Sequence, residues 1–288
     1  MFSIIIPTFN NLEYLKLCLD SINKNSKFNH QIIAHVNIGN DGTKEYLKSK
    51  NIEFTFTEYN SGICEGMNTA SKKAKFEYIL YAHDDFYFCP EWDKFFSDEI
   101  KKIGHNRFYL SGIMMNNGPI KFDCGNSLID FDEQKLLNNF KNVNHYDFQG
   151  STWAPHLIHK KLWNEVGGFS EEYFPGTGSD PDLNMKLWKA GIRIFKGINN
   201  CKVYHFGSIV TRKYKNHPTI TTESGSKGSK IFLLKWGISV KFFKKYYLRS
   251  DKIYDGALKE PKKTFDFLLK LMLCKIYYIY TLIISKIK

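Results

Sequence analysis

The sequence predicts an α/β fold with a Rossmann-like, mostly parallel sheet that is flanked by helices. Two observations support this prediction. Hydrophobic residues make up 43% of the 288 residues, which is enough for a sizeable core. Within about the first hundred residues, short apolar runs alternate four times with segments of helical periodicity. Such alternation is typical of parallel strands covered by helices on both faces.

The first four strand and helix pairs are bounded by turn residues. Pro7 closes the first apolar run, Gly39 and Gly42 bracket the turn after the second, and Gly62 ends the turn after the third. The expected strands are 2–6, 31–38, 53–57 and 78–82, and the expected helices are 12–22, 43–50, 63–74 and 91–103.

The second half is less regular but still alternates. Gly191 ends a helix that begins at Ser179 or Asp180. The other expected elements are strands at 108–114, 192–195 and 202–206, an extended stretch at 151–157, and helices at 132–140 and 159–166. We expect one domain at 1–210, made of two parts at about 1–105 and about 106–210. Residues 211–288 are expected to form a flexible segment and a basic, apolar, helical tail.

Charge is concentrated at the C-terminal end. From residue 225 onward the chain has 15 Lys and Arg against 4 Asp and Glu, so this part carries +11 of the total +12. A basic and apolar end favours an anionic membrane surface over nucleic acid, and we expect no nucleic-acid partner. The six cysteines form no CxxC pair, which fits a reducing compartment, and no signal peptide is expected. These observations predict a cytoplasmic protein, peripheral at the inner face of a membrane.

The segment 265–288 is mostly apolar but contains Asp266, Lys270 and Lys275. These charges argue against a spanning helix and favour an interfacial helix. Lysines in the preceding segment would assist it, namely Lys241, Lys244, Lys245, Lys262 and Lys263. The alternative is a helix that packs on the catalytic domain with solvated lysines.

Polar clusters follow three of the expected strands, at 8–10, 37–41 and 83–85. In parallel sheets ligands bind beyond these strand ends. The adjacent carboxylates Asp84 and Asp85 repel each other, and a cation relieves that repulsion. Oxygen ligands on an open strand end suit Mg²⁺ or Mn²⁺. The alternative is that both aspartates cap a turn before Pro90.

Three further features are candidates for chemistry. Asp180 and Asp182 fall at the expected start of a helix, where one can cap the helix and the other can act as a general base; the spacing leaves open which. His205 follows an apolar strand, where a core histidine is the more frequent case, although it could complete a metal site with Asp85. Trp153 is the aromatic residue we select as a candidate to stack on an acceptor sugar.

Together these motifs resemble the family 2 glycosyltransferases, which have the GT-A fold. The resemblance covers about residues 2–208. Its segments are Ser-Ile-Ile-Ile-Pro-Thr-Phe-Asn at 3–10, Asn-Ser-Gly at 60–62 followed by Asn68 and Ala74, Tyr-Ile-Leu at 78–80 leading into Asp84-Asp85, Gly-Gly-Phe at 167–169, and Ser-Asp-Pro-Asp-Leu at 179–183.

The resemblance implies a role for each matching residue. Asp85 and His205 would bind Mn²⁺ or Mg²⁺, and Asp180 would deprotonate the acceptor hydroxyl. The domain at 1–210 would be catalytic, with a nucleotide-sugar half at about 1–105 and an acceptor half at about 106–210. Trp153 and Asp182 would belong to the acceptor site. The residues implied to bind the nucleotide sugar are Pro7, Thr8, Asn10, Asn37, Gly62, Asn68 and Asp84. The implied reaction transfers a sugar from a UDP-sugar to a glycan or lipid-linked hydroxyl acceptor with inversion.

The chain departs from the family pattern at three positions. Asn37 stands where the family usually has Asp, His83 replaces one acid of the acidic triplet, and Ser179 replaces the Glu of the base motif. Two other functions remain open. A sugar-nucleotide pyrophosphorylase would need a Gly-rich loop with Lys or Arg near the N-terminus, and a non-catalytic membrane or nucleic-acid binding module would need neither Asp180 nor a metal pair.

Overall fold

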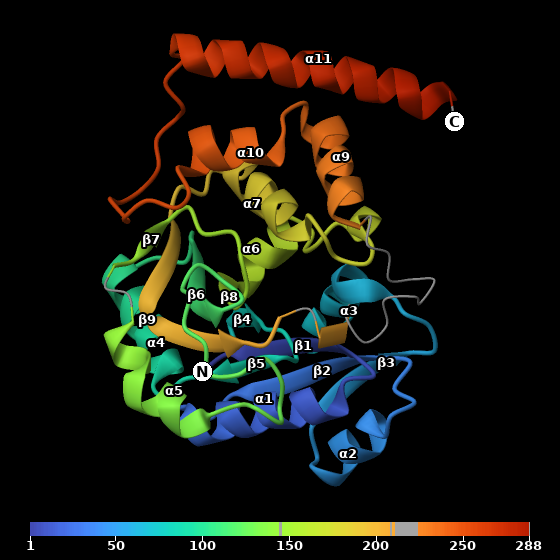
Figure 1. The fold of residues 1–288 in the computed structure, drawn as a ribbon, viewed down its shortest axis with the longest axis vertical. Helices are drawn as coiled ribbons and strands as arrows, with labels where there is room; N and C mark the ends of the chain where they lie inside the picture. Colours follow the sequence, from blue (N-terminus) through green and yellow to red (C-terminus); the bar gives the residue numbers. More distant parts are fainter. Residues whose placement is uncertain (144–145, 208, 211–223, 288) are drawn as a thin grey trace.

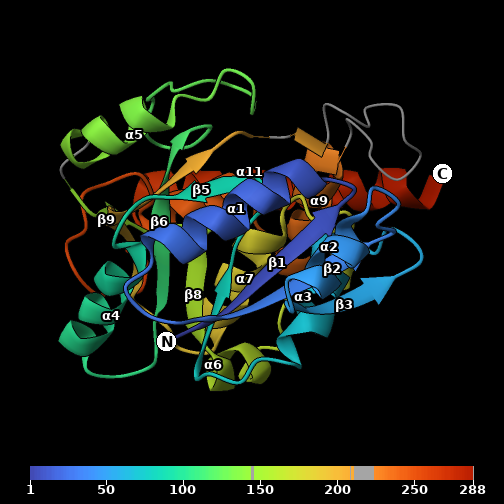
Figure 2. The same cartoon turned by 90° about the horizontal axis from the view of Figure 1, so that it is seen from below.

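The protein is built on one nine-stranded mixed sheet, seen in a computed structural model that describes residues 1–143, 146–207, 209–210 and 224–287 (Figure 1). The strand order is β3-β2-β1-β4-β8-β6-β9-β5, and β7 pairs with β9. Helix α1 covers one face of this sheet, and α3, α6 and α7 lie on the other (Figures 1 and 2). The predicted mostly parallel sheet with flanking helices is therefore confirmed.

The N-terminal half follows the predicted alternation. Its elements are β1 (Ser3–Phe9), α1 (Leu12–Asn25), β2 (Gln31–Asn37), α2 (Thr43–Ser49), β3 (Glu53–Thr57), α3 (Gly62–Ser71), β4 (Tyr78–Tyr81), β5 (Phe86–Phe88) and α4 (Trp92–Ile103). Strands β1 to β4 are mutually parallel, and Phe9 pairs with Asn37 at their C-terminal ends. Leu15, Leu19 and Ile22 of α1 are buried, as their helical spacing predicts.

The second half introduces antiparallel strands. Its elements are β6 (Tyr109–Asn116), α5 (Glu133–Asn139), η1 (Phe140–Asn142), β7 (Phe148–Gln149), β8 (His156–His159), α6 (Lys160–Glu165), η2 (Glu171–Tyr173), α7 (Ser179–Lys189) and β9 (Phe195–His205). Strand β8 is antiparallel to both β4 and β6. Strand β9 runs parallel to β6 and ends beside Asp85, because β5 pairs with it antiparallel.

One prediction for this half is wrong. We expected two strands at 192–195 and 202–206, but β9 runs unbroken from Phe195 to His205. The residues between them include Lys196, Gly197, Asn199 and Asn200, which are types depleted in strands. Lys196 is instead buried and ion-paired at 2.8 Å to both Glu99 and Asp147, so the strand continues through it.

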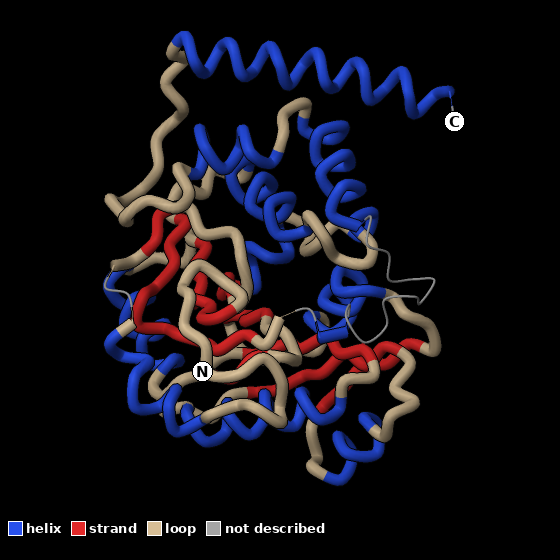
Figure 3. The backbone as a smooth tube through the Cα atoms, in the orientation of Figure 1, coloured by secondary structure: helices blue, strands red, loops and turns tan. Residues whose placement is uncertain are grey.

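The C-terminal region forms a helical layer above the sheet (Figure 3). It comprises α9 (Ser224–Trp236), α10 (Val240–Phe242), η3 (Phe243–Leu248) and α11 (Phe265–Ile287). Phe232, Phe243 and Leu248 are buried in the same core cluster as the strands, so this region is not a separate core. The polar stretch expected to be flexible, 211–229, lies outside the described residues as far as 223, and its last six residues are instead the first turns of α9. Helix α11 is long and apolar enough to cross a membrane by length and composition.

Candidate active site

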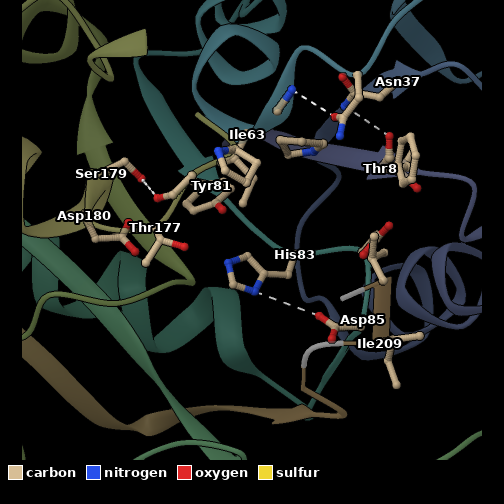
Figure 4. Close-up of a pocket in the computed structure, with 18 of the residues that line it drawn as sticks. Thr8, Asn37, Ile63, Tyr81, His83, Asp85, Thr177, Ser179, Asp180 and Ile209 are labelled. Atoms are coloured by element: carbon tan, nitrogen blue, oxygen red, sulfur yellow. Dashed lines mark hydrogen bonds and ion pairs between the residues drawn. The ribbon is translucent and has the colours of Figure 1, made fainter. Parts of the chain in front are cut away.

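A cleft of about 470 Å³ opens at the C-terminal ends of the parallel strands (Figure 4). It brings together β1, β2, β4 and β9 with the start of α3 and of α7. Among the described residues, it is lined by 7–9, Asn37, Asn60, Gly62, Ile63, Tyr81, 83–85, 175–180, His205, Ile209 and Val210. The predicted placement of a ligand site beyond the strand ends therefore matches the position of the cleft.

A group of three potential metal ligands lies at one end of the cleft. Asp85 follows β4, and His205 ends β9 with its Nε2 atom 3.5 Å from Asp85 Oδ1. His83 Nδ1 lies 3.9 Å from the same oxygen. One ligand atom from each side chain lies within 4.8 Å of the other two. One carboxylate oxygen and two imidazole nitrogens at this separation fit a single divalent ion of the transition series.

The tautomer of His205 also suits a metal. His205 Nδ1 lies 2.8 Å from the carbonyl oxygen of Asn117, which can only accept, so Nδ1 carries a proton and Nε2, which faces Asp85, is the nitrogen available to a metal. Burial acts to lower the pKa of His205, but the contact with Asp85 outweighs it and raises the pKa. Burial acts to raise the pKa of Asp85, and the contacts with His205 and His83 outweigh it and lower the pKa.

Asp84 lies beside this group but in a different environment. Burial, and then the charge of Asp85, raises the pKa of Asp84 to about 7. Asp84 Oδ2, Thr8 Oγ1 and Asn11 Nδ2 are buried and make no well-aligned hydrogen bond within the described part of the chain, although Thr8 and Asn11 lie close enough to Asp84 to act to lower its pKa. Buried polar atoms are nearly always paired, so this corner is suited to a polar ligand.

Asn37 lines the cleft from the end of β2, and the structure explains why it is not an aspartate. Its Oδ1 atom accepts 2.8 Å hydrogen bonds from the backbone N–H and the hydroxyl of Ser61. Its Nδ2 atom donates to the carbonyl oxygen of Thr8 at 3.3 Å. A carboxylate could not donate that bond. The amide therefore ties the ends of β1 and β2 to the turn before α3.

Asp180 lies in the first turn of α7 and faces the cleft (Figure 4). Burial alone raises its pKa to about 7. Its Oδ1 atom has no hydrogen-bond partner among the described residues, and His156 Nδ1 lies 3.9 Å from it. The neighbouring Ser179 donates a 2.7 Å hydrogen bond to the carbonyl oxygen of Gly176 and so closes the turn that presents Asp180.

Asn10 and Asn68, which we expected in the nucleotide-sugar site, lie outside the cleft. Asn10 Oδ1 accepts a 2.9 Å hydrogen bond from the backbone of Asn40. The amide of Asn68 bonds both the N–H and the C=O of Phe169, and Asn68 Nδ2 also donates to Glu171. Asn68 is therefore a brace between α3 and the segment before η2.

Trp153 and Asp182, expected at an acceptor site, also lie away from the cleft. Trp153 Nε1 donates to the carbonyl oxygen of Gly112 at 2.8 Å. Asp182 is fully buried and accepts hydrogen bonds from Ser170 at 2.6 Å and from Trp236 Nε1 at 2.8 Å. It also forms an ion pair with Lys235 at 3.1 Å. Asp182 thus anchors α9 to α7. The expectation that Asp180 or Asp182 caps the helix is wrong, because the N-cap residue of α7 is Gly178.

His83 is the site residue that sequence reasoning did not identify. It was noted only as a missing carboxylate. His83 and Asp85 lie in the short turn between β4 and β5, and the nearness of His83 to the predicted metal ligand Asp85 is the signal that could have revealed it. Eight of the residues expected in the site line the cleft, namely Pro7, Thr8, Asn37, Gly62, Asp84, Asp85, Asp180 and His205.

Comparison with known proteins agrees with this geometry. The chain matches the model of "Glycosyl transferase family 2" over residues 3–153, just over half its length. It is similar to S. aureus TarS with 16% identity and a TM-score of 0.55, covering 81% of this chain and 39% of TarS. It is also similar to S. aureus TarS 1–349 in complex with UDP-GlcNAc, with 16% identity and a TM-score of 0.56, covering 81% of this chain and 66% of that one.

The chain thus spans about two fifths of the TarS chain, and identities this low show a shared GT-A fold alone. No curated protein matches the chain. The family match, however, runs through β1, the turn before α3 and the Asp84-Asp85 segment, where the cleft forms. The chain therefore belongs to glycosyl transferase family 2.

Proposed function

We propose that this enzyme transfers a sugar from a UDP-sugar to a hydroxyl acceptor with inversion at the anomeric carbon. One observation carries the proposal: a single cleft contains a set of metal ligands and, separately, an unpaired carboxylate with a raised pKa. S. aureus TarS has been crystallised with UDP and with UDP-GlcNAc, which supports UDP as the nucleotide here.

The donor would bind along the strand ends. Thr8 and Asn37 would line the nucleotide portion. Asp84 would meet a ribose or sugar hydroxyl, because its carboxylate lines the cleft and makes no well-aligned hydrogen bond among the described residues. None of the described residues that line the cleft is Lys or Arg. Neutralisation of the diphosphate within this part of the cleft would therefore depend on a cation.

Asp85, His205 and His83 would hold that cation. A divalent ion there would neutralise the charge that develops on the diphosphate leaving group. Mg²⁺ prefers all-oxygen shells, whereas imidazole favours transition metals, so this donor set favours Mn²⁺ over Mg²⁺.

Asp180 would be the general base. Its carboxylate takes the proton of the acceptor hydroxyl as the oxygen attacks the anomeric carbon. The new C–O bond forms opposite the bond to the diphosphate, which breaks and takes its electron pair with it; attack from the opposite face inverts the centre. A base with a pKa near 7 is partly ionised at neutral pH, so it can accept a proton, and it still binds that proton strongly enough to assist the attack.

We further propose a glycan or lipid-linked acceptor, and an enzyme that works in the cytoplasm, peripheral at the inner face of a membrane. The basic C-terminal region supports this location, because residues from 225 onward carry a net charge of +11.

The test is a panel of nucleotide sugars with Mn²⁺, measured for binding and for slow hydrolysis. We expect UDP-sugars to bind, and Asp85→Ala to lose metal-dependent binding. Asp98→Ala serves as a control, because Asp98 pairs only at the surface with Lys94. The proposal fails if Asp85→Ala binds and hydrolyses as the wild type does. Release of pyrophosphate from a nucleoside triphosphate and a sugar phosphate would instead identify a pyrophosphorylase.

A further inference from the structure

Helix α11 packs on the rest of the protein through one narrow stripe. Phe267, Leu271, Cys274, Tyr278 and Thr281 alternate at spacings of four and three, and all are buried or partly buried. The phenyl ring of Phe267 lies 5.0 Å from that of Phe242 in α10, and Cys274 Sγ lies 3.6 Å from Ser239 Oγ. The helix thus rests on α9 and α10 with a fixed side facing the protein (Figure 1).

The opposite side of α11 is apolar and exposed. Successive residues are about 100° apart around a helix, which places Met272, Ile276, Ile279 and Ile283 directly away from the stripe. Each of the four is more than half exposed. We call these four residues the outward face. Phe265, Leu268, Leu269, Leu273 and Tyr280 extend it on both sides and are exposed as well.

This arrangement reverses the usual amphipathic pattern. A helix of a soluble domain turns its most apolar stripe inward and its polar residues outward. In α11 the inward stripe includes Cys274, Tyr278 and Thr281, whereas Ile and Met side chains form the outward face. Only 11% of its 18-residue apolar window is buried, so α11 is not a core helix. Apolar surface of this extent marks an interaction site.

Lysines border the outward face. At about 100° per residue, Lys270 and Lys275 fall on the two flanks of α11, between the outward face and the protein. Both side chains are exposed. Flanking lysines of this kind extend their ammonium groups to lipid headgroups when the apolar face enters the acyl region.

We propose that α11 lies in the plane of an anionic membrane, with the outward face among the acyl chains and Lys270 and Lys275 at the headgroups. This proposal rests on the peripheral location proposed above and identifies the surface that contacts the membrane. It does not depend on sugar transfer. The membrane would then hold the cleft at a fixed distance from a lipid-linked acceptor.

Two other occupants fit the observations less well. A second copy would bring two regions of charge +11 together, and their repulsion opposes pairing, whereas anionic lipid is complementary. A spanning α11 would have to leave α9 and α10, and would place Lys270 and Lys275 within hydrocarbon, which is costly.

Co-sedimentation of the full chain with vesicles tests the proposal. The probes are vesicles of phosphatidylcholine alone and of phosphatidylcholine with phosphatidylglycerol. We expect binding to the anionic vesicles, and a loss of about 100-fold or more when the four residues of the outward face are changed to Ser. Thermal unfolding followed by circular dichroism should be unchanged, because none of the four contributes to the core.

A matched pair of variants distinguishes the effect of the outward face from that of exposed apolar residues elsewhere. Ile276→Ser with Ile279→Ser should weaken binding about 10-fold. Ile129→Ser with Ile253→Ser changes two exposed isoleucines elsewhere and should leave binding as it was. Lys270→Gln with Lys275→Gln should reduce the preference for anionic vesicles by about 10-fold.

Several results would overturn the proposal. Undiminished vesicle binding by the outward-face variant would exclude this surface. Retention of the wild type in the membrane after alkaline carbonate extraction would indicate a spanning helix. Self-association that depends on the outward face, without any vesicle binding, would show that a second copy is the partner. None of these outcomes bears on nucleotide-sugar binding, so the proposed function is tested separately.

Discussion

The two ends of the cleft hold carboxylates whose environments are opposite. Asp85 lies between two imidazoles, and its pKa is lowered despite burial. Asp180 has no cationic partner among the described residues, and burial raises its pKa to about 7. The two aspartates are therefore suited to different tasks. Asp85 keeps a negative charge that can bind a cation, and Asp180 can take up and release a proton.

The largest effect that separates the two ends is on turnover. Asp180→Asn keeps the shape of the side chain but removes the base, so we expect turnover to fall by about 10²- to 10⁴-fold. Binding of metal and of nucleotide should stay within a few-fold of wild type, because the variant leaves Asp85, His83 and His205 untouched. Steady-state kinetics with isothermal titration would check this. An equal loss of nucleotide affinity would mean that the two ends are not independent.

Asp182 lies in the same helix as Asp180 but has a structural rather than a chemical role. Its carboxylate satisfies Trp236 and Lys235 in a fully buried position, so Asp182→Ala should destabilise the fold by about 3 kcal/mol. Denaturant unfolding at pH 7 measures the change. A decrease in the free energy of unfolding of less than about 0.5 kcal/mol would contradict the anchoring role. The control, Asp98→Ala, should lower the free energy of unfolding by about 0.5 kcal/mol at most, because Asp98 pairs with Lys94 at the surface.

His83 tests how the metal end is made. His83→Ala should weaken Mn²⁺ affinity by about 10- to 100-fold, the usual cost of an impaired metal site. His83→Asp should restore affinity and improve binding of Mg²⁺ relative to Mn²⁺, because it replaces nitrogen with oxygen. Electron paramagnetic resonance of Mn²⁺ reports both. Unchanged affinity in His83→Ala would remove His83 from the ligand set.

The smallest effect concerns the pH dependence of stability. A carboxyl whose pKa is raised on folding binds more protons in the native state between about pH 4 and pH 7, so stability falls as the pH rises through this window. Above it, the ionised Asp180 destabilises the fold. Its side chain is 30% exposed, so solvent screens part of this cost. We expect Asp180→Asn to be about 1 kcal/mol more stable than wild type at pH 8 and equal to it at pH 4. Thermal unfolding at both pH values would show the difference.

Much of the fold could be predicted because it follows from local patterns. Apolar runs and helical spacing in the first hundred or so residues specify β1 to β4 and the helices between them. Strand β9 could not be predicted as continuous, because only the tertiary pairing of Lys196 with Glu99 and Asp147 makes its middle buried.

The sequence predicted that the strand-end residues would lie together, but it could not predict which side chains form long-range contacts. The spacing of Asp180 and Asp182 says nothing about which carboxylate faces Trp236, a residue of a distant helix. Asn68 and Trp153 have partners more than 40 residues away, so the sequence could not show that their polar atoms are already used. Residues at strand ends were easier, because topology alone brings them to one edge.

The central claim is that Asp85 and Asp180 divide metal binding and proton transfer between them. The most direct measurement is UDP affinity with and without Mn²⁺ in wild type, Asp85→Asn and Asp180→Asn. We predict that Mn²⁺ strengthens UDP binding in the wild type and in Asp180→Asn, and has no effect in Asp85→Asn. Metal-dependent UDP binding that survives in Asp85→Asn would contradict the account.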